Sequence, residues 1–332
     1  MLKVSNSRIN TWRRCHYSHF LKYVRKLEKK KKNPNLARGS VIHKCIEAYH
    51  SGKSWKKPFK EYEEHFYKTT FAEEILENGD IPKMVFDLLE NYFFFYEDEE
   101  FTYLKNEFEF ELELVPGITL VGFIDALVED EKGGVWGKET KTYKSLPGRE
   151  FLLFNNQSAN YTWALAKLGY KVEGMMWDIV KAKRPTMPKL TAKTGVLSQA
   201  KLDSTPLSVR KGIIELGLDP NDYEEFINSH SFENYFIRNN IRLNQTVVNS
   251  ILQDTIYTAR EIQEKGEVSK DRNLGRDCSW CDFKPICQAE LMGLDVDFII
   301  QTDYEKREKD GDKEKTQNKG SKKGRRGKLK VH

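Results

Sequence analysis

The sequence predicts an α/β fold in which helices precede and follow a β-sheet. Residues 107–114 alternate strictly between Glu at odd positions and Phe or Leu at even ones, the pattern of a half-buried strand. Residues 122–142 place two runs rich in β-branched and aromatic residues around the turn-forming sequence DEKGG (130–134), which predicts a hairpin. An amphipathic helix over 155–168 and a further core strand over 173–182 follow.

Length and cysteine content limit the class of protein. At 332 residues the chain can bury one large core or two modest ones. No apolar run approaches the ~20 residues that span a bilayer, and the N-terminal MLKVSNSRINTW lacks the apolar segment of a signal peptide. We therefore expect a cytoplasmic protein, in the host cytoplasm if a phage encodes it, without a membrane partner. Five unevenly placed cysteines then favour metal or cluster ligation over a disulfide framework.

The net charge of +5 comes from the C-terminus. Residues 319–332 hold seven Lys or Arg and no acid, so the rest of the chain carries a net charge of −2. A nucleic-acid surface on the folded part must therefore depend on local basic patches. Residues 302–332 contain almost no apolar side chains, which predicts a disordered basic tail. Its basic end is expected to add non-specific affinity for DNA.

The hairpin carries two acids and a lysine in a suggestive arrangement. If its turn centres near Lys132, residues whose numbers sum to about 264 face each other, and Asp125 and Glu139 satisfy that sum. Two facing carboxylates repel, and Mg²⁺ or Mn²⁺ between them removes the repulsion. Lys141 shares the face of Glu139, where an ammonium can orient an attacking water or stabilise an anionic transition state. The alternative is a surface hairpin with solvated charges.

The helix predicted over 36–50 has an apolar stripe, and His43, Glu47 and His50 lie on another face. From the residues alone, His43 is most simply an exposed histidine. A zinc site made from these three side chains is an alternative, but it lacks a fourth ligand nearby. We expect Glu47 and His50 at the surface and Cys45, which lies on the apolar stripe, in the core.

In the helix over 155–168, Gln157 and Tyr161 are four residues apart and share a face. An amide and a phenol hydroxyl placed in this way can hold a phosphate or a base edge. The alternative is an ordinary helix surface.

Together these motifs resemble a known family. Asp125 with Glu139-Thr140-Lys141 resembles the signature of the PD-(D/E)xK nuclease superfamily, and the surrounding residues resemble its RecB-like exonuclease branch in particular. That branch carries a G-x-x-x-H helix before the core, matched by residues 39–43, and a Q-x-x-x-Y helix after it, matched by residues 157–161. The resemblance implies a restriction-endonuclease-like core, in which helices flank a central mixed β-sheet.

The resemblance also implies roles for these residues. His43, Asp125, Glu139 and the backbone carbonyl of Thr140 would bind Mg²⁺ or Mn²⁺. Lys141 would position the attacking water. Gln157 and Tyr161 would hold the DNA strand. Asp125, Glu139 and Lys141 would thus be the catalytic residues.

Three cysteines form a C-x₂-C-x₅-C motif at Cys278, Cys281 and Cys287. Three thiolates at this spacing indicate ligation of a metal or a cluster, and Cys15 is the distant candidate for a fourth ligand. RecB-like nucleases of the AddB and CRISPR-associated kinds carry one cysteine before the core and three after it. The resemblance therefore implies a [4Fe–4S] cluster that joins the helical N- and C-terminal parts. Structural Zn²⁺ is the chemical alternative, because four cysteines also suit zinc.

The expected organisation is a single nuclease domain over residues 1–301. Its parts are N-terminal helices at 1–100, the sheet core at 101–182, a basic insert with helices at 183–272, and the cysteine loop at 273–290. Within the third part, residues 238–265 read as one long amphipathic helix. The basic stretch over 183–208 is either the lining of a nucleic-acid groove or a surface excursion.

The hypothesis that follows is a stand-alone, metal-dependent DNA exonuclease, because no G-x-x-x-x-G-K-[ST] loop of a helicase motor is present. It would act in DNA recombination or repair, or in phage DNA processing. Its partners would be single-stranded DNA or duplex ends, with a strand-annealing or single-strand-binding protein. The alternatives are a nuclease that trims CRISPR prespacers with an integrase, and a catalytically silent DNA-binding scaffold.

Overall fold

The computed structural model describes residues 1–31, 34–99 and 101–307. Its centre is a six-stranded sheet with the order β1-β4-β5-β6-β7, and β3 pairs with the remaining edge of β4. The strands are β1 (Leu2–Val4), β3 (Thr102–Val115), β4 (Ile118–Glu129), β5 (Val135–Tyr143), β6 (Gly174–Lys181) and β7 (Phe236–Ile241). The pairs β1–β4 and β5–β6 are parallel and the others antiparallel, so the sheet is mixed, as expected.

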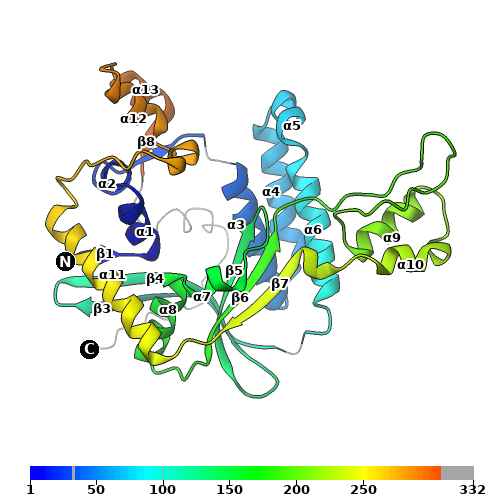
Figure 1. The fold of residues 1–332 in the computed structure, drawn as a ribbon, viewed down its shortest axis with the longest axis horizontal. Helices are drawn as coiled ribbons and strands as arrows, with labels where there is room; N and C mark the ends of the chain where they lie inside the picture. The colour runs from blue at the N-terminus through cyan, green and yellow to red at the C-terminus, as the bar shows by residue number, and fades with distance from the viewer. Residues whose placement is uncertain (32–33, 100, 308–332) are drawn as a thin grey trace.

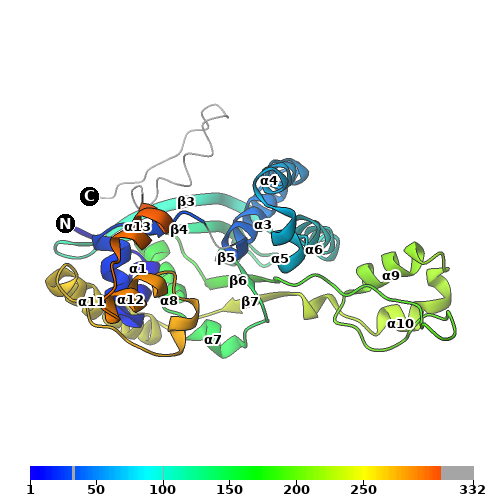
Figure 2. The ribbon, with the colours of Figure 1, turned by 90° about the horizontal axis from the view of Figure 1, so that it is seen from above.

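Helices cover both faces of this sheet (Figures 1 and 2). They are α1 (Asn6–Arg14), α2 (His16–His19), α3 (Pro34–His50), α4 (Lys56–Thr69), α5 (Ala72–Asn78), α6 (Ile81–Phe95), α7 (Arg149–Leu153), α8 (Asn156–Lys167), α9 (Pro206–Glu215), α10 (Glu224–Asn228), α11 (Gln245–Lys265), α12 (Lys284–Leu291) and α13 (Asp297–Asp303). In the described parts of the chain, no helix is long and apolar enough to cross a membrane.

Two hydrophobic cores lie on opposite faces of the sheet. Trp177 and Ile179 of β6 enter a core shared with α1, α8 and α11. Val180, which points the other way because side chains alternate along a strand, enters a core shared with α3, α4 and α6. In strand β3, buried and exposed side chains alternate as expected: Phe108 and Phe110 are buried and Glu109 is exposed. Fold class and layering therefore agree with the prediction.

The N-terminal helix is interrupted at Cys15. Ser5 caps α1 by accepting a hydrogen bond from the backbone N–H of Arg8. Cys15 then adopts an extended conformation (φ −168°, ψ 119°), and the chain continues as α2 and a π-helix, η1 (Phe20–Val24). This interruption frees the Cys15 side chain from the helix face and places it in a pocket described below.

The predicted helix over 238–265 is wrong in its first part. Residues 236–241 form β7, which pairs antiparallel with β6, and α11 begins only at Gln245 after an Asn244 cap. Arg238 in this strand contacts Asp178 of β6 through a long-range ion pair. That partner lies 60 residues away in the sequence, so local periodicity gives no sign of it.

The C-terminal boundary also differs from the prediction. The chain stays ordered beyond Thr302, since α13 ends at Asp303 and β8 (Tyr304–Lys306) pairs antiparallel with β2 (Leu27–Lys29). The expected disordered tail therefore begins too early in the prediction, and its part from residue 308 onward lies outside the described residues. The β2–β8 pair joins the two ends of the fold, with α12 and α13 beside α2 (Figure 1).

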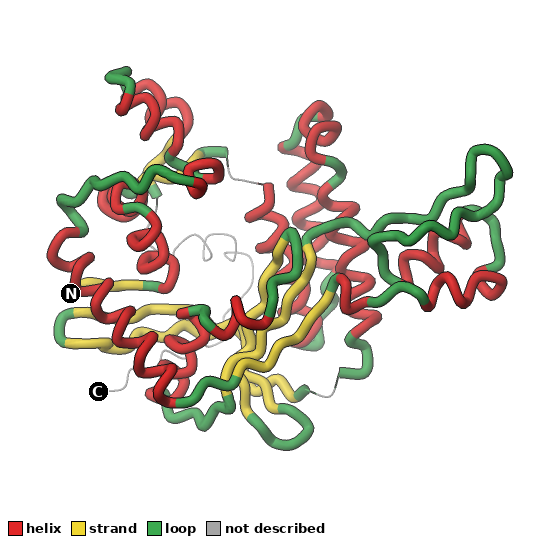
Figure 3. The backbone as a smooth tube through the Cα atoms, viewed as in Figure 1, coloured by secondary structure: helices red, strands yellow, loops and turns green. Residues whose placement is uncertain are grey.

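The basic stretch 183–208 leads into a projecting unit, which the backbone trace shows as long loops followed by α9 and α10 (Figure 3). The unit has its own small core, which includes Leu197, Val209 and Ile213. At its base, Lys183 forms an ion pair with Asp203 and Arg184 forms one with Asp87. Two basic side chains of the stretch considered for a nucleic-acid groove are therefore already engaged with carboxylates, although Asp203 is shared with Lys181.

Candidate active site

The turn of the β4–β5 hairpin is built by Asp130. Its carboxylate accepts hydrogen bonds from the backbone N–H groups of Lys132 and Gly134 and from the indole N–H of Trp136. This local chemistry fixes the register, and residue numbers across the pair sum to 264 as predicted. The pairs are Ala126 with Lys138, Leu127 with Gly137, Val128 with Trp136 and Glu129 with Val135.

Asp125 and Glu139 are the next residues along the two strands, immediately beyond this ladder. There the backbone N–H of Thr140 donates a 2.8 Å hydrogen bond to Asp125 Oδ2. Further back along the same edge of β4, residues 118–120 pair with β1. On this edge of β4, residues 121–125 lie between the part that pairs with β1 and the part that pairs with β5, and they pair with neither strand. Asp125 is the last residue of this segment. That gap gives its carboxylate room to bind the backbone of β5.

Glu139 is almost fully buried at 1% exposure. Its Oε2 accepts hydrogen bonds from Lys141 Nζ at 2.8 Å and from Gln157 Nε2 at 3.0 Å. Its Oε1 is buried and has no hydrogen-bond partner within the described part of the structure. Burial raises the pKa of Glu139 to about 7, with Lys141 opposing the rise and Asp125 adding to it. A buried carboxylate oxygen of this kind is costly unless a cation or a donor meets it.

For Lys141 and Asp125, unlike for Glu139, the neighbouring groups outweigh the effect of burial on the pKa. Burial acts to lower the pKa of Lys141, but Glu139 and Asp125 outweigh it and hold the pKa above its ordinary value. Burial acts to raise the pKa of Asp125, but His43, Lys141 and the Thr140 backbone outweigh it and lower the pKa. Asp125 and Lys141 are thus held charged beside Glu139.

His43 reaches this site from α3. Its Nδ1 lies 3.4 Å from Asp125 Oδ2. The helix is anchored by its apolar stripe, in which Ile42 and Cys45 are fully buried as predicted. A side chain at Gly39 would place its Cβ 3.3 Å from Thr142 Oγ1 of β5. The glycine of the G-x-x-x-H pattern therefore lets α3 pack close to the strand that carries Glu139, and this packing brings His43 to Asp125.

Gln157 and Tyr161 share a face of α8, and only the first lies at the surface of the site. Gln157 contacts Glu139, whereas Tyr161 is 6% exposed and packs edge-on against Phe110 with ring centroids 5.4 Å apart. The Tyr161 hydroxyl hydrogen-bonds with Gln157, and burial raises the pKa of the phenol. Tyr161 thus holds Gln157 in place from the buried side of α8.

His50 is not at the surface, so that expectation is wrong. Its side chain is 7% exposed, stacks on Tyr103 with ring centroids 4.2 Å apart, and lies 3.8 Å from Glu99. Burial lowers its pKa to about 3, so the imidazole is neutral. His50, Glu47 and His43 line a cavity of about 30 Å³ with Asp125. The three side chains of α3 therefore line one cavity, but only His50 is buried there, since the His43 side chain is still 31% exposed.

Sequence reasoning missed a buried ionic network on the other face of β5. Lys138 Nζ lies 2.6 Å from Asp178 Oδ2, and Arg238 Nε lies 3.3 Å from Asp178 Oδ1. Asp178 is fully buried and also accepts a hydrogen bond from the hydroxyl of Tyr92. Arg238 in turn binds Glu99. The one signal in the sequence was an aspartate within the otherwise apolar strand 174–180.

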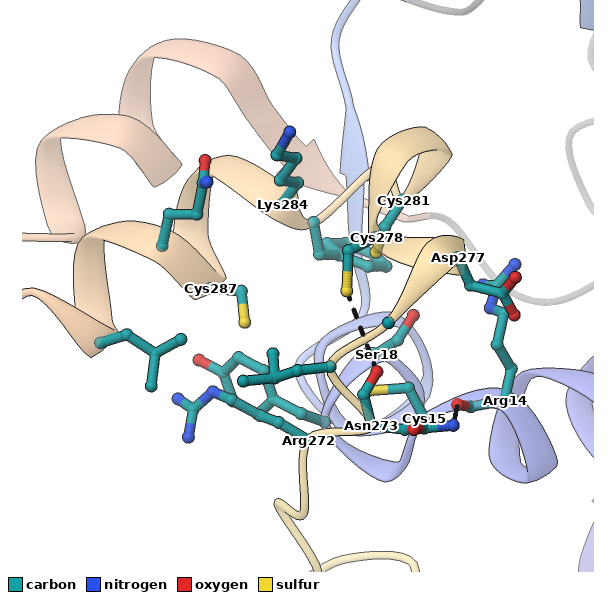
Figure 4. A pocket seen from close by; sticks show the side chains of 16 residues that line it. Arg14, Cys15, Ser18, Arg272, Asn273, Asp277, Cys278, Cys281, Lys284 and Cys287 are labelled. Carbon is teal, nitrogen blue, oxygen red and sulfur yellow. Dashed lines mark hydrogen bonds between the residues drawn. The ribbon is translucent and has the colours of Figure 1, made fainter.

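The four predicted cluster cysteines line one cavity of about 330 Å³ (Figure 4). Cys15 comes from the break after α1, Cys278 from the 3₁₀ helix η4 (Arg276–Trp280), Cys281 from the residue after it, and Cys287 from α12. All four thiols are free and half-buried. Arg272 contacts Cys287 with a side-chain hydrogen bond, although burial still raises the pKa of that thiol.

Neither the acidic site nor the cysteine cavity forms a closed coordination shell. Within residues 1–31, 34–99 and 101–307, no three His, Cys, Asp or Glu side chains are already grouped to hold a metal ion. The donor chemistry nevertheless fits a metal at both places. The unpartnered Oε1 of Glu139, beside a second carboxylate and an imidazole, suits a hard divalent cation. The four thiols suit iron–sulfur or zinc.

Comparison with known proteins places the chain in a family. A search of curated proteins finds no match. The solved structure titled "Crystal structure of SSO0001" aligns with a TM-score of 0.32 and 12% identity over 86% of both chains, a likeness too low to carry an argument. The family model for the PD-(D/E)XK nuclease superfamily matches residues 3–288, a range that includes the β4–β5 hairpin and α8. The chain belongs to the PD-(D/E)XK nuclease superfamily.

Proposed function

We propose that the protein is a DNA exonuclease of the RecB-like branch that depends on Mg²⁺ or Mn²⁺. Nucleases of this superfamily typically use these ions, and membership implies a DNA substrate. One observation carries the proposal: Glu139 is a buried carboxylate with an unpartnered oxygen, next to Asp125 and within the same site as His43. A folding role alone does not explain this arrangement, because burying an unpaired carboxylate oxygen costs free energy.

Asp125, Glu139, His43 and the carbonyl of Thr140 would hold the cation. When bound, the cation would supply Lewis-acid stabilisation of the phosphate and a more acidic water. Lys141 is held charged, so its ammonium can orient that water or stabilise the negative charge that develops on the phosphate. Gln157 fixes the carboxylate of Glu139 through a 3.0 Å hydrogen bond, and Tyr161 fixes Gln157. Outer residues of this kind set the direction in which a ligand points.

The cysteine cavity supports the RecB-like assignment. We propose that Cys15, Cys278, Cys281 and Cys287 bind a [4Fe–4S] cluster, with Zn²⁺ as the alternative. The thiols come from both ends of the chain, and ligation would cross-link two ends that β2 and β8 already bring together. Closing a loop of this length constrains the unfolded chain and so stabilises the fold. The nuclease domain would then extend through β8.

The test compares Glu139→Gln with Glu109→Gln, a glutamate on the exposed face of β3. Both proteins are purified anaerobically, assayed for iron and zinc, and incubated with end-labelled single- and double-stranded DNA in Mn²⁺. Glu139→Gln should lower the rate of digestion at least about 100-fold while Glu109→Gln leaves it unchanged. Equal digestion by Glu139→Gln, or no digestion by the unaltered protein, would contradict the proposal. In the second case, retained DNA binding would indicate a scaffold.

The proteins that copurify with the chain would indicate the pathway in which it acts. Copurification with integrase subunits would place the exonuclease in CRISPR prespacer trimming. Copurification with a strand-annealing or single-strand-binding protein would place it in recombination or in phage DNA processing. Absorbance near 400 nm with bound iron would support the cluster, and a colourless zinc protein that still cuts DNA would replace the cluster with zinc.

A further inference from the structure

Two phenylalanines beside the candidate active site are exposed to solvent. Phe151 of α7 is 57% exposed, and Phe154, which ends that helix, is 73% exposed. They are three residues apart, so their rings lie on one side of the helix. A single exposed apolar residue on a protein surface needs no explanation. Two exposed aromatic rings on one side of a five-residue helix, next to catalytic groups, do need an explanation.

The first link to the site runs along β5. Glu139, Lys141 and Tyr143 occupy alternate positions and therefore share a face of the strand. The electrostatic effect of Lys141 on the Tyr143 hydroxyl agrees with this arrangement. The Tyr143 ring meets the Phe151 ring edge-on, with centroids 6.3 Å apart. An aromatic path thus begins at Tyr143, two residues beyond the catalytic lysine, and leads to α7.

The second link runs through the start of α8. Asn155 caps this helix by accepting a hydrogen bond from the backbone N–H of Gln157, and Gln157 contacts Glu139. Phe154 occupies the position before the cap. An apolar residue there commonly packs on the fourth helical residue, here Ala159. Ala159 is fully buried while Phe154 stays 73% exposed, so the ring does not serve that packing.

We propose that Phe154, with Phe151 beside it, stacks on a base of single-stranded DNA whose phosphate lies at Glu139 and Lys141. The inference rests on the proposed nuclease function. Stacking on aromatic rings tolerates every base, because each base has a π-face, and this suits an enzyme that must pass over any sequence. The path ends at the polar groups of Glu139, Gln157 and Lys141, and these favour a nucleotide over an apolar protein segment as the ligand.

The test measures DNA binding without cleavage, in Ca²⁺ and without Mg²⁺ or Mn²⁺. Fluorescence anisotropy with a labelled single strand gives the affinity, and 2-aminopurine, moved stepwise from the end, reports stacking through quenching. Phe154→Ala should weaken binding roughly 5- to 150-fold and abolish the quenching at one position. Phe154→Trp should retain both. The matched control is Phe298→Ala on α13, where Phe298 is 71% exposed in the C-terminal part of the fold, away from α7 and α8 (Figure 1).

A strand with an abasic nucleotide at the quenched position is the second control, because it lacks the base on which the ring would stack. On that strand, Phe154→Ala and the unaltered protein should bind equally, because the ring has no base to contact. Unchanged affinity of Phe154→Ala on the normal strand, or the same loss on the abasic strand, would overturn the inference. These outcomes are separate from those of the nuclease proposal. A protein that never cuts DNA but shows Phe154-dependent quenching overturns only the function, and one that cuts with no such dependence overturns only the stacking.

Discussion

At the scale of single residues, Gln157 is the most informative position of the site. Its amide donates to Glu139 and it is itself held by the Tyr161 hydroxyl. It is neither a proposed metal ligand nor a group that moves a proton. Through its hydrogen bond Gln157 orients the Glu139 carboxylate, in addition to the DNA contact that the sequence leads us to expect of it.

We predict that Gln157→Ala raises the Mn²⁺ concentration for half-maximal DNA cleavage roughly 10- to 100-fold, the usual cost of losing a residue that orients a metal ligand. The measurement is a titration of cleavage rate against Mn²⁺. Gln245→Ala serves as the control, because Gln245 is exposed and its side chain contacts Asn249 of the same helix. An unchanged Mn²⁺ dependence in Gln157→Ala would show that Glu139 needs no such support.

A second residue-scale prediction concerns Asp178, on the face of the sheet behind the site. Asp178→Asn leaves the buried ammonium of Lys138 without its counter-charge, which should lower the free energy of unfolding by about 3–5 kcal/mol. Chemical denaturation measures this loss. Glu173→Gln breaks an exposed pair with Arg242 and should cost no more than about 1 kcal/mol. If Asp178→Asn is as stable as Glu173→Gln, the buried pair is not a principal source of stability. Adding Lys138→Met should recover part of the loss.

At the scale of elements, the packing of α3 on β5 decides whether the site is assembled. The G-x-x-x-H pattern predicted a histidine on a helix, but the pattern does not say which strand the helix meets. The structure gives a physical reason for the glycine: a Cβ at Gly39 would lie 3.3 Å from Thr142 Oγ1.

We predict that Gly39→Leu moves α3 away from β5, separates His43 from Asp125, and lowers Mn²⁺-dependent cleavage by about tenfold or more. Because leucine is a good helix former, α3 itself should persist. Activity and circular dichroism are compared with Lys44→Leu, an exposed position of the same helix. Full activity in Gly39→Leu would mean that the helix and the strand adjust without disturbing the site.

At the scale of the whole molecule, the N-terminal part and the last described strand form one structural unit. β8 pairs with β2, and Tyr304 packs on Phe283 and donates a hydrogen bond to the carbonyl of Asp282, in the loop between Cys281 and Cys287. The loop between Cys281 and Cys287 is therefore held by a strand that the sequence pattern assigned to a tail.

We predict that a chain ending at residue 303 has a lower melting temperature and loses its bound iron or zinc more readily than a chain ending at residue 307. The reason is that only the shorter chain lacks Tyr304 and the β2–β8 pair. The chain ending at 307 should keep the stability of the full chain and lose some salt-dependent DNA affinity with the basic end. Equal stability of the two truncated chains would contradict the role given to β8.

The sequence by itself determined the features that short-range chemistry controls. The Asp130 turn set the hairpin register, alternation defined β3, and the order of His43, Asp125, Glu139–Lys141 and Gln157 indicated the family. The tertiary structure decided the features that depend on distant partners. They are the gap in β4 that holds Asp125, the burial of His50, the pairing of Arg238 with Asp178, and the strand β8. Each requires a contact between segments far apart in the chain, and hydrophobic periodicity within one segment carries no information about such a contact.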